Sequence, residues 1–195
     1  MKHLIIKQTL LFCFLFSTVY TIAQSDTSKF NYYNKGRNVI SPILSTAISS
    51  GKFVGINIGV RYGRFIMNKL CVGLQANFYH ADKYFQAGGV QPFARYYILN
   101  KKLSPFLETH YGCWLSKQNN GGSGTDRQEW TGISNAVYAG TGLAYTGIFK
   151  LLGIELYGGY GYSTTVYKNL PPYFDIHNYV QRSGFSYGLR INFYF

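Results

Sequence analysis

The chain has 195 residues and a formal net charge of +12; aromatic residues make up 18% of it and charged residues only 13%. After the amino terminus no run of roughly eighteen apolar residues remains, which excludes helical membrane spans. The basic residues are dispersed over tail, turns and strands rather than gathered in a patch, so we expect no nucleic-acid partner. Aromatic-rich, charge-poor composition is instead typical of a β-barrel whose aromatic side chains face lipid.

The first residues have the features of a secretory signal. Lys2 and Lys7 precede the apolar run 10–16, and the small-residue exit Thr21-Ile22-Ala23 predicts cleavage after Ala23. Without these two lysines, seventeen basic residues oppose seven acidic ones, so the mature net charge is about +10. We expect a signal peptide at 1–23, an amino-terminal tail at 24–37 and one barrel domain at 38–195.

Eight segments alternate apolar and polar side chains with period two, as strands with two different faces do. In the clearest, Ile56, Ile58 and Val60 alternate with Asn57 and Gly59. The first segment is the weakest, and its Pro42 lies near the start, where we expect a missing hydrogen-bond donor to do least harm. The predicted strands are 39–50, 53–65, 70–79, 90–99, 103–116, 133–146, 151–165 and 182–195.

The connections between these segments alternate in length. They are short after the second, fourth and sixth segments, whereas 81–89, 117–131 and 166–180 are long; only the first link, at Gly51-Lys52, breaks the rule. Short periplasmic turns and long outer loops are typical of bacterial outer-membrane barrels. We therefore predict an all-β, eight-stranded antiparallel transmembrane β-barrel with up-and-down order and a periplasmic tail. A soluble lipocalin-like barrel, with its aliphatic faces inward, is the alternative.

Three runs carry a family resemblance: Tyr62-Gly63-Arg64-Phe65, Phe93-Ala94-Arg95-Tyr96-Tyr97 and the terminal Ile191-Asn192-Phe193-Tyr194-Phe195. Over 36–195 the chain resembles the small bacterial outer-membrane barrels related to the OmpA transmembrane domain and OmpX, of the Bacteroidota type. The resemblance implies location in the outer membrane. It also implies that Ile191, Phe193 and Phe195 form a signal for the barrel assembly machinery.

Five charged residues fall on predicted inward faces. An eight-stranded barrel has an interior that side chains just fill, and charges buried there should be paired. A two-residue loop at Lys101-Lys102 would place Arg95 opposite Glu108. We expect a structural plug of ion pairs, with a narrow gated path for small ions as the alternative. The predicted interior charge network is Arg61, Arg95, Glu108, Glu155 and Arg190.

No residue pattern indicates catalysis or metal binding. His80 with Asp82, and His177 with Asp175, lack the paired spacing of metal sites, so we expect no metal and no cofactor. His110 and Ser116 on one strand would lie about 20 Å apart, too far for a catalytic pair.

The two mature cysteines are not expected to form a disulfide. Cys71 is predicted to point inward and Cys113 outward, on strands that are not neighbours.

These observations favour a monomeric outer-membrane barrel with a structural or surface-interaction role. Its expected partners are outer-membrane lipids and the assembly machinery, with an unidentified ligand of the outer loops as a further candidate. The alternatives are a narrow porin-like channel and, third, a barrel enzyme acting on lipid or peptide.

Overall fold

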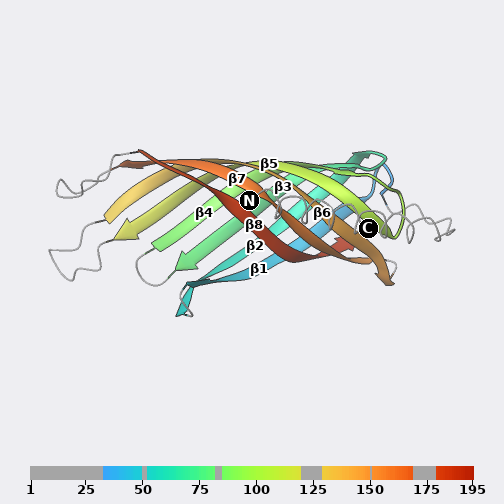
Figure 1. The fold of residues 1–195 in the computed structure, drawn as a ribbon, viewed down its shortest axis with the longest axis horizontal. Coiled ribbons are helices and arrows are strands. Elements are labelled where there is room, and N and C mark those ends of the chain that lie inside the picture. The colour runs from blue at the N-terminus through green and yellow to red at the C-terminus, as the bar shows by residue number, and fades with distance from the viewer. Residues whose placement is uncertain (1–32, 50–51, 82–84, 120–128, 150, 169–178) are drawn as a thin grey trace, which may run out of the picture.

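The computed structural model describes residues 33–49, 52–81, 85–119, 129–149, 151–168 and 179–195. Eight antiparallel strands close into a barrel in chain order (Figure 1). This confirms the predicted all-β, up-and-down fold. Among these residues no helix is long and apolar enough to cross a membrane. The strands are β1 (Asn38–Ser49), β2 (Lys52–Met67), β3 (Leu70–Ala81), β4 (Phe85–Tyr97), β5 (Leu103–Asn119), β6 (Glu129–Phe149), β7 (Leu152–Lys168) and β8 (Tyr179–Tyr194).

The barrel has two unlike ends. The turn end carries the β2–β3, β4–β5 and β6–β7 connections together with the start of β1 and the end of β8 (Figure 1). The opposite end is called the loop end below. The β4–β5 register places Arg95 opposite Glu108, which confirms the predicted pairing. The predicted signal peptide lies outside the described residues.

The strands reach further toward the loop end than the sequence predicts. Residues 81–89 were expected to be a loop, yet Ala81 ends β3 and Phe85 begins β4. Gly89 allows close packing inside the sheet, because a Cβ there would lie 2.5 Å from the ring of Trp114. The other two expected loops, 117–131 and 166–180, likewise lose residues to strands at both ends.

The two faces of the sheet differ as their side chains do. Apolar side chains such as Ile58, Val60 and Leu74 point outward and are exposed, whereas Gln75 and Gln91 are buried inside. Because the aliphatic faces point outward, the lipocalin-like alternative is wrong. The middle of the interior is polar and its turn end is aromatic.

An aromatic cluster closes the turn end. Tyr33, which precedes β1, is fully buried and stacks on Tyr97 with ring centroids 3.9 Å apart. The Lys69 backbone N–H donates to the Tyr33 carbonyl at 2.7 Å, and the Tyr33 N–H donates to Asn100 Oδ1 at 3.2 Å. Gly36 adopts a φ of 92°, a conformation that glycine allows at low cost. The end of the predicted tail 24–37 is therefore folded into the barrel mouth.

Candidate functional site

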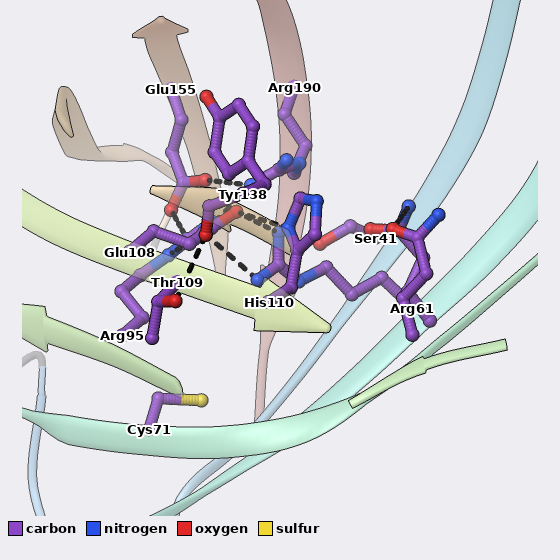
Figure 2. A network of polar contacts seen from close by, with 12 residues as sticks. Ser41, Arg61, Cys71, Arg95, Glu108, Thr109, His110, Tyr138, Glu155 and Arg190 are labelled. Atoms are coloured by element: carbon purple, nitrogen blue, oxygen red, sulfur yellow. Dashed lines mark hydrogen bonds and ion pairs between the residues drawn. The ribbon is translucent and has the colours of Figure 1, made fainter. Parts of the chain in front are cut away.

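The candidate site is a cluster of five buried charges in the middle of the barrel, called the interior charge cluster below. Each of the five side chains is at most 8% exposed. The period-two alternation turns all of them inward, and five different strands supply them. Figure 2 shows Arg95, Glu108, Glu155 and Arg190 pointing toward one another. The cluster consists of Arg61 (β2), Arg95 (β4), Glu108 (β5), Glu155 (β7) and Arg190 (β8).

Glu108 is shared by three guanidinium groups. Arg61 donates from Nη1 to Oε1 at 3.0 Å and pairs through Nη2 with Oε2 at 2.9 Å. Arg95 donates from Nε to Oε2 at 2.7 Å and also pairs through Nη2. Arg190 Nη1 lies 3.5 Å from the same oxygen. Such charge-assisted contacts are the strong class of hydrogen bond, and here they cross the lumen.

Glu155 forms the second centre of the cluster and is fully buried. It pairs with Arg95 Nη1, and Arg190 Nη1 lies 3.3 Å from its Oε2. Two phenols complete its shell: Tyr97 donates to Oε1 at 2.9 Å and Tyr194 at 3.3 Å. Arg95 therefore joins both carboxylates, so the cluster is one network rather than separate pairs.

Aromatic rings lie against the guanidinium groups. The Cζ atom of Arg61 is 3.4 Å from the centroid of Phe93, and that of Arg190 is 4.3 Å from the centroid of Tyr157. Arg95 lies 4.3 Å from Phe106 in the same way. Cation–π contact is strongest where water is excluded, as it is at these buried groups. These contacts fill the space between the charges.

Three tyrosines of the site were not predicted from the sequence: Tyr97, Tyr194 and Tyr157. The signal was available, because each of these residues lies at an even spacing from a predicted inward charge on its own strand: Tyr97 from Arg95, Tyr194 from Arg190 and Tyr157 from Glu155. What the sequence did not indicate is which ring meets which charge, since those contacts cross between strands.

His110 lies beside the cluster. Its Nδ1 is 3.8 Å from Glu108 Oε1, and its ring stacks on Tyr138 with centroids 4.4 Å apart. Ser116 instead donates to the Gly132 carbonyl at 3.3 Å. The two residues considered as a catalytic pair thus have separate partners.

The remaining candidates lie away from the cluster. Cys71 is buried and Cys113 exposed, and neither is in a disulfide within the described part of the chain. Ile191, Phe193 and Phe195 point outward at the turn end. Over the described ranges no group of three or more His, Cys, Asp or Glu side chains could hold a metal ion. Asp82, Asp175 and His177 fall outside those ranges.

Fold and site together define a closed antiparallel barrel with an apolar outer surface and an ionic interior. No protein-family model and no curated protein matches the sequence. Among solved structures, the chain is similar to the N-terminal β-barrel domain of Pseudomonas aeruginosa OprF, with 12% identity, a TM-score of 0.47 and coverage of 83% of this chain and 98% of that one. It is also similar to Neisserial surface protein A (NspA), with 19% identity, a TM-score of 0.42 and coverage of 81% and 92%.

Proposed function

We propose that the chain is a bacterial outer-membrane β-barrel protein, related to the OmpA transmembrane domain and OmpX, with a structural or surface-interaction role. The observation that carries this proposal is the reversed polarity of the barrel: exposed apolar side chains outside, buried ion pairs inside. In lipid a closed barrel satisfies its backbone hydrogen bonds and turns its apolar side chains to the hydrocarbon. In water the same surface would be an aggregation hazard.

Outward aromatic residues near the turn end support this placement. Tyr62, Tyr96 and Tyr145 are exposed on β2, β4 and β6, the three strands that run into the short turns. Girdles of aromatic residues lie at the membrane interfaces of such barrels. With this orientation the turn end is periplasmic, and the loop end presents its connections outside, where a surface partner would bind.

A structural role is favoured over conduction by what fills the lumen. The interior charge cluster crosses the barrel, and Tyr33 and its aromatic neighbours fill the turn end. Planar-bilayer recording of the wild type and Glu108→Ala tests the channel alternative. We expect no conductance from the wild type; stable single-channel steps that change in Glu108→Ala would favour the channel.

The location is tested by fractionating cells that express the full chain. We expect the protein in the outer-membrane fraction, extractable only with detergent, and with an electrophoretic mobility that shifts on heating, as folded barrels show when they resist unfolding. Recovery in the soluble periplasmic fraction without detergent would overturn the proposal. We further propose that the protein is a monomer and that Ile191, Phe193 and Phe195 form the signal for the barrel assembly machinery.

A further inference from the structure

A hollow of about 290 Å³ lies on the outer face of the barrel near its loop end and is called the outer hollow below. Ligand pockets typically measure about 300 to 1000 Å³, so the outer hollow has room for a segment of one acyl chain rather than for a bulky ligand. Ala87 and Ser116 also line it, but most of its lining residues belong to the outward set of the strand alternation: Phe78, Gln86, Gly88, Leu115, Lys117 and Thr131.

The outer hollow exists where Gly88 has no side chain. The register places Gly88 between Phe78 of β3 and Leu115 of β5, whose outward side chains are 51% and 67% exposed. The nearest side-chain contact of a Cβ on Gly88 would be the Phe78 ring at 3.8 Å, an ordinary contact distance. Close packing therefore does not require this glycine, unlike Gly89, where a Cβ would clash. Two apolar side chains thus form walls on either side of an open position.

The row of outward positions one step closer to the loop end is polar. It crosses five neighbouring strands, and each of its side chains is exposed. None of the five is acidic, and two of them are lysines. The row consists of His80, Gln86, Lys117, Thr131 and Lys168. The apolar walls of the outer hollow therefore end at a rim that carries positive charge.

Lys117 is the cationic group that lines the outer hollow itself. Its Nζ lies 3.2 Å from Glu129 Oε2, and the two side chains of this pair are 67% and 41% exposed. Exposed ion pairs contribute little, so a phosphate can compete with the Glu129 carboxylate for Lys117. Lys168 lies two strands away in the same row, so the two lysines and Glu129 together have a net charge of 2 − 1 = +1. An anion is therefore favoured at this rim.

We propose that the outer hollow binds one phosphorylated lipid. An acyl chain lies over Gly88 between Phe78 and Leu115, and the phosphate is bound by Lys117 with the Thr131 hydroxyl as a further donor. Free phosphate would use the rim but not the walls, and an uncharged lipid would use the walls but not the rim.

The orientation of the barrel agrees with such a ligand. With the loop end outside, the walls of the outer hollow lie deeper in the membrane than its rim. A lipid of the outer leaflet has the same order, with its acyl chains inward and its headgroup at the surface. The proposal thus rests on the proposed outer-membrane location and names one lipid site on that surface.

The test is native mass spectrometry of the mature chain in a neutral detergent, titrated with dimyristoyl phosphatidic acid. Dimyristoylglycerol and inorganic phosphate are the comparison ligands. We expect one saturable phosphatidic acid per barrel, bound about tenfold more tightly than either comparison ligand, because each of these lacks one half of the recognition. Equal binding of either comparison ligand, or addition of several lipids without saturation, would overturn the proposal.

Two lysine variants test the rim. Lys117→Gln should weaken phosphatidic acid binding about tenfold, because a charge-assisted contact is removed. Lys35→Gln is the matched control, since Lys35 is also exposed but precedes β1 at the turn end. It should bind as the wild type does. Equal affinities of the two variants would show that overall charge, rather than this site, attracts the lipid.

Two glycine variants test the walls without touching a charge. Gly88→Leu fills the outer hollow and should weaken phosphatidic acid binding about tenfold, because the acyl chain loses its place. Gly158→Leu is the matched control: this glycine of β7 also faces outward, and a Cβ there would make ordinary contacts of 3.6 and 3.7 Å. Equal affinities of the two glycine variants would contradict the proposal.

Heat-shifted electrophoretic mobility checks that each variant is folded. Binding is measured on the purified barrel, whereas the location is measured by cell fractionation. A protein that is found in the outer membrane but does not bind phosphatidic acid would therefore overturn the lipid site alone.

Discussion

Arg95 faces Glu108 directly across the β4–β5 ladder, and its Nε donates to Glu108 Oε2 at 2.7 Å. The same guanidinium also pairs with Glu155 from β7, so one arginine connects strands on different sides of the lumen. Buried charges thus connect strands on different sides of the barrel interior.

Removing the Glu108 carboxylate should be strongly destabilising. In Glu108→Gln three buried guanidinium groups share one carboxylate, and breaking a buried pair in this way costs about 3 to 5 kcal/mol. Urea unfolding of the barrel refolded into lipid vesicles measures the change. Glu129→Gln is the control, because its pair with Lys117, at 3.2 Å, is exposed and contributes about 0 to 1 kcal/mol. Similar losses in the two variants would contradict the role of the cluster.

Tyr33 should control access to the turn end. In Tyr33→Ala the ring stacked on Tyr97 is lost, and emptying such a buried site costs about 3 kcal/mol or more. Cys71, which belongs to the same aromatic cluster, should then react with a water-soluble maleimide roughly a hundredfold faster, the factor that corresponds to that free energy. Both proteins compared, the one with Tyr33 and the Tyr33→Ala variant, also carry Cys113→Ser, so that only the buried Cys71 of the mature chain is labelled. Equal rates with and without Tyr33 would show that the segment does not close the mouth.

The docking of Tyr33 should weaken at alkaline pH. Burial, followed by the neighbouring Tyr97, holds the pKa of the Tyr33 phenol well above its ordinary value of 10.0. Since the unfolded phenol ionises first, its contribution to folding is fully present below about pH 10 and falls as the pH rises further. Unfolding free energies of wild type and Tyr33→Phe at pH 8 and pH 11 measure this. The wild type should lose more stability than the variant, which has no group to ionise there; parallel losses would contradict the assignment.

The terminal aromatic should act in assembly more than in stability. Phe195→Ala removes the outward ring but keeps both backbone hydrogen bonds between Phe195 and Asn38. We expect less barrel in the outer membrane, with the unfolding free energy of the purified, folded variant within about 0.5 kcal/mol of the wild type, as for surface substitutions. Leu107→Ala, also outward and exposed, is the control for loss of an apolar surface side chain. Equal yields of the two variants would argue against a terminal signal.

The alternation of side chains along each strand was enough to predict which charged residues face the interior, because side chains two positions apart in a strand point to the same side. The β4–β5 register followed from the short loop. Parity does not say which inward groups meet across the lumen, so the phenols around Glu155 were missed.

Three further features depended on tertiary contacts that the sequence does not encode locally. Gly88 and Gly89 predict a loop when only the sequence is considered, whereas in the structure Trp114 packs over Gly89 within the sheet. Tyr33 lies in a segment without strand periodicity, and its burial is decided by rings from β2, β4 and β8. The position of Pro42 relative to β8 could not be predicted from the sequence either. The first strand of the barrel meets the last strand only when the ring closes, so the pairing of β1 with β8 depends on the fold of the whole chain.

The central claim, that the apolar outer face contacts lipid, is tested most directly by spin labels at the exposed Ile58, Val60, Leu74 and Leu107. Each is introduced singly into the cysteine-free chain refolded in vesicles, and its collisions with oxygen and with a water-soluble nickel complex are compared. If the outer face contacts lipid, all four sites should show high accessibility to oxygen and low accessibility to nickel. High nickel accessibility at these sites would contradict it.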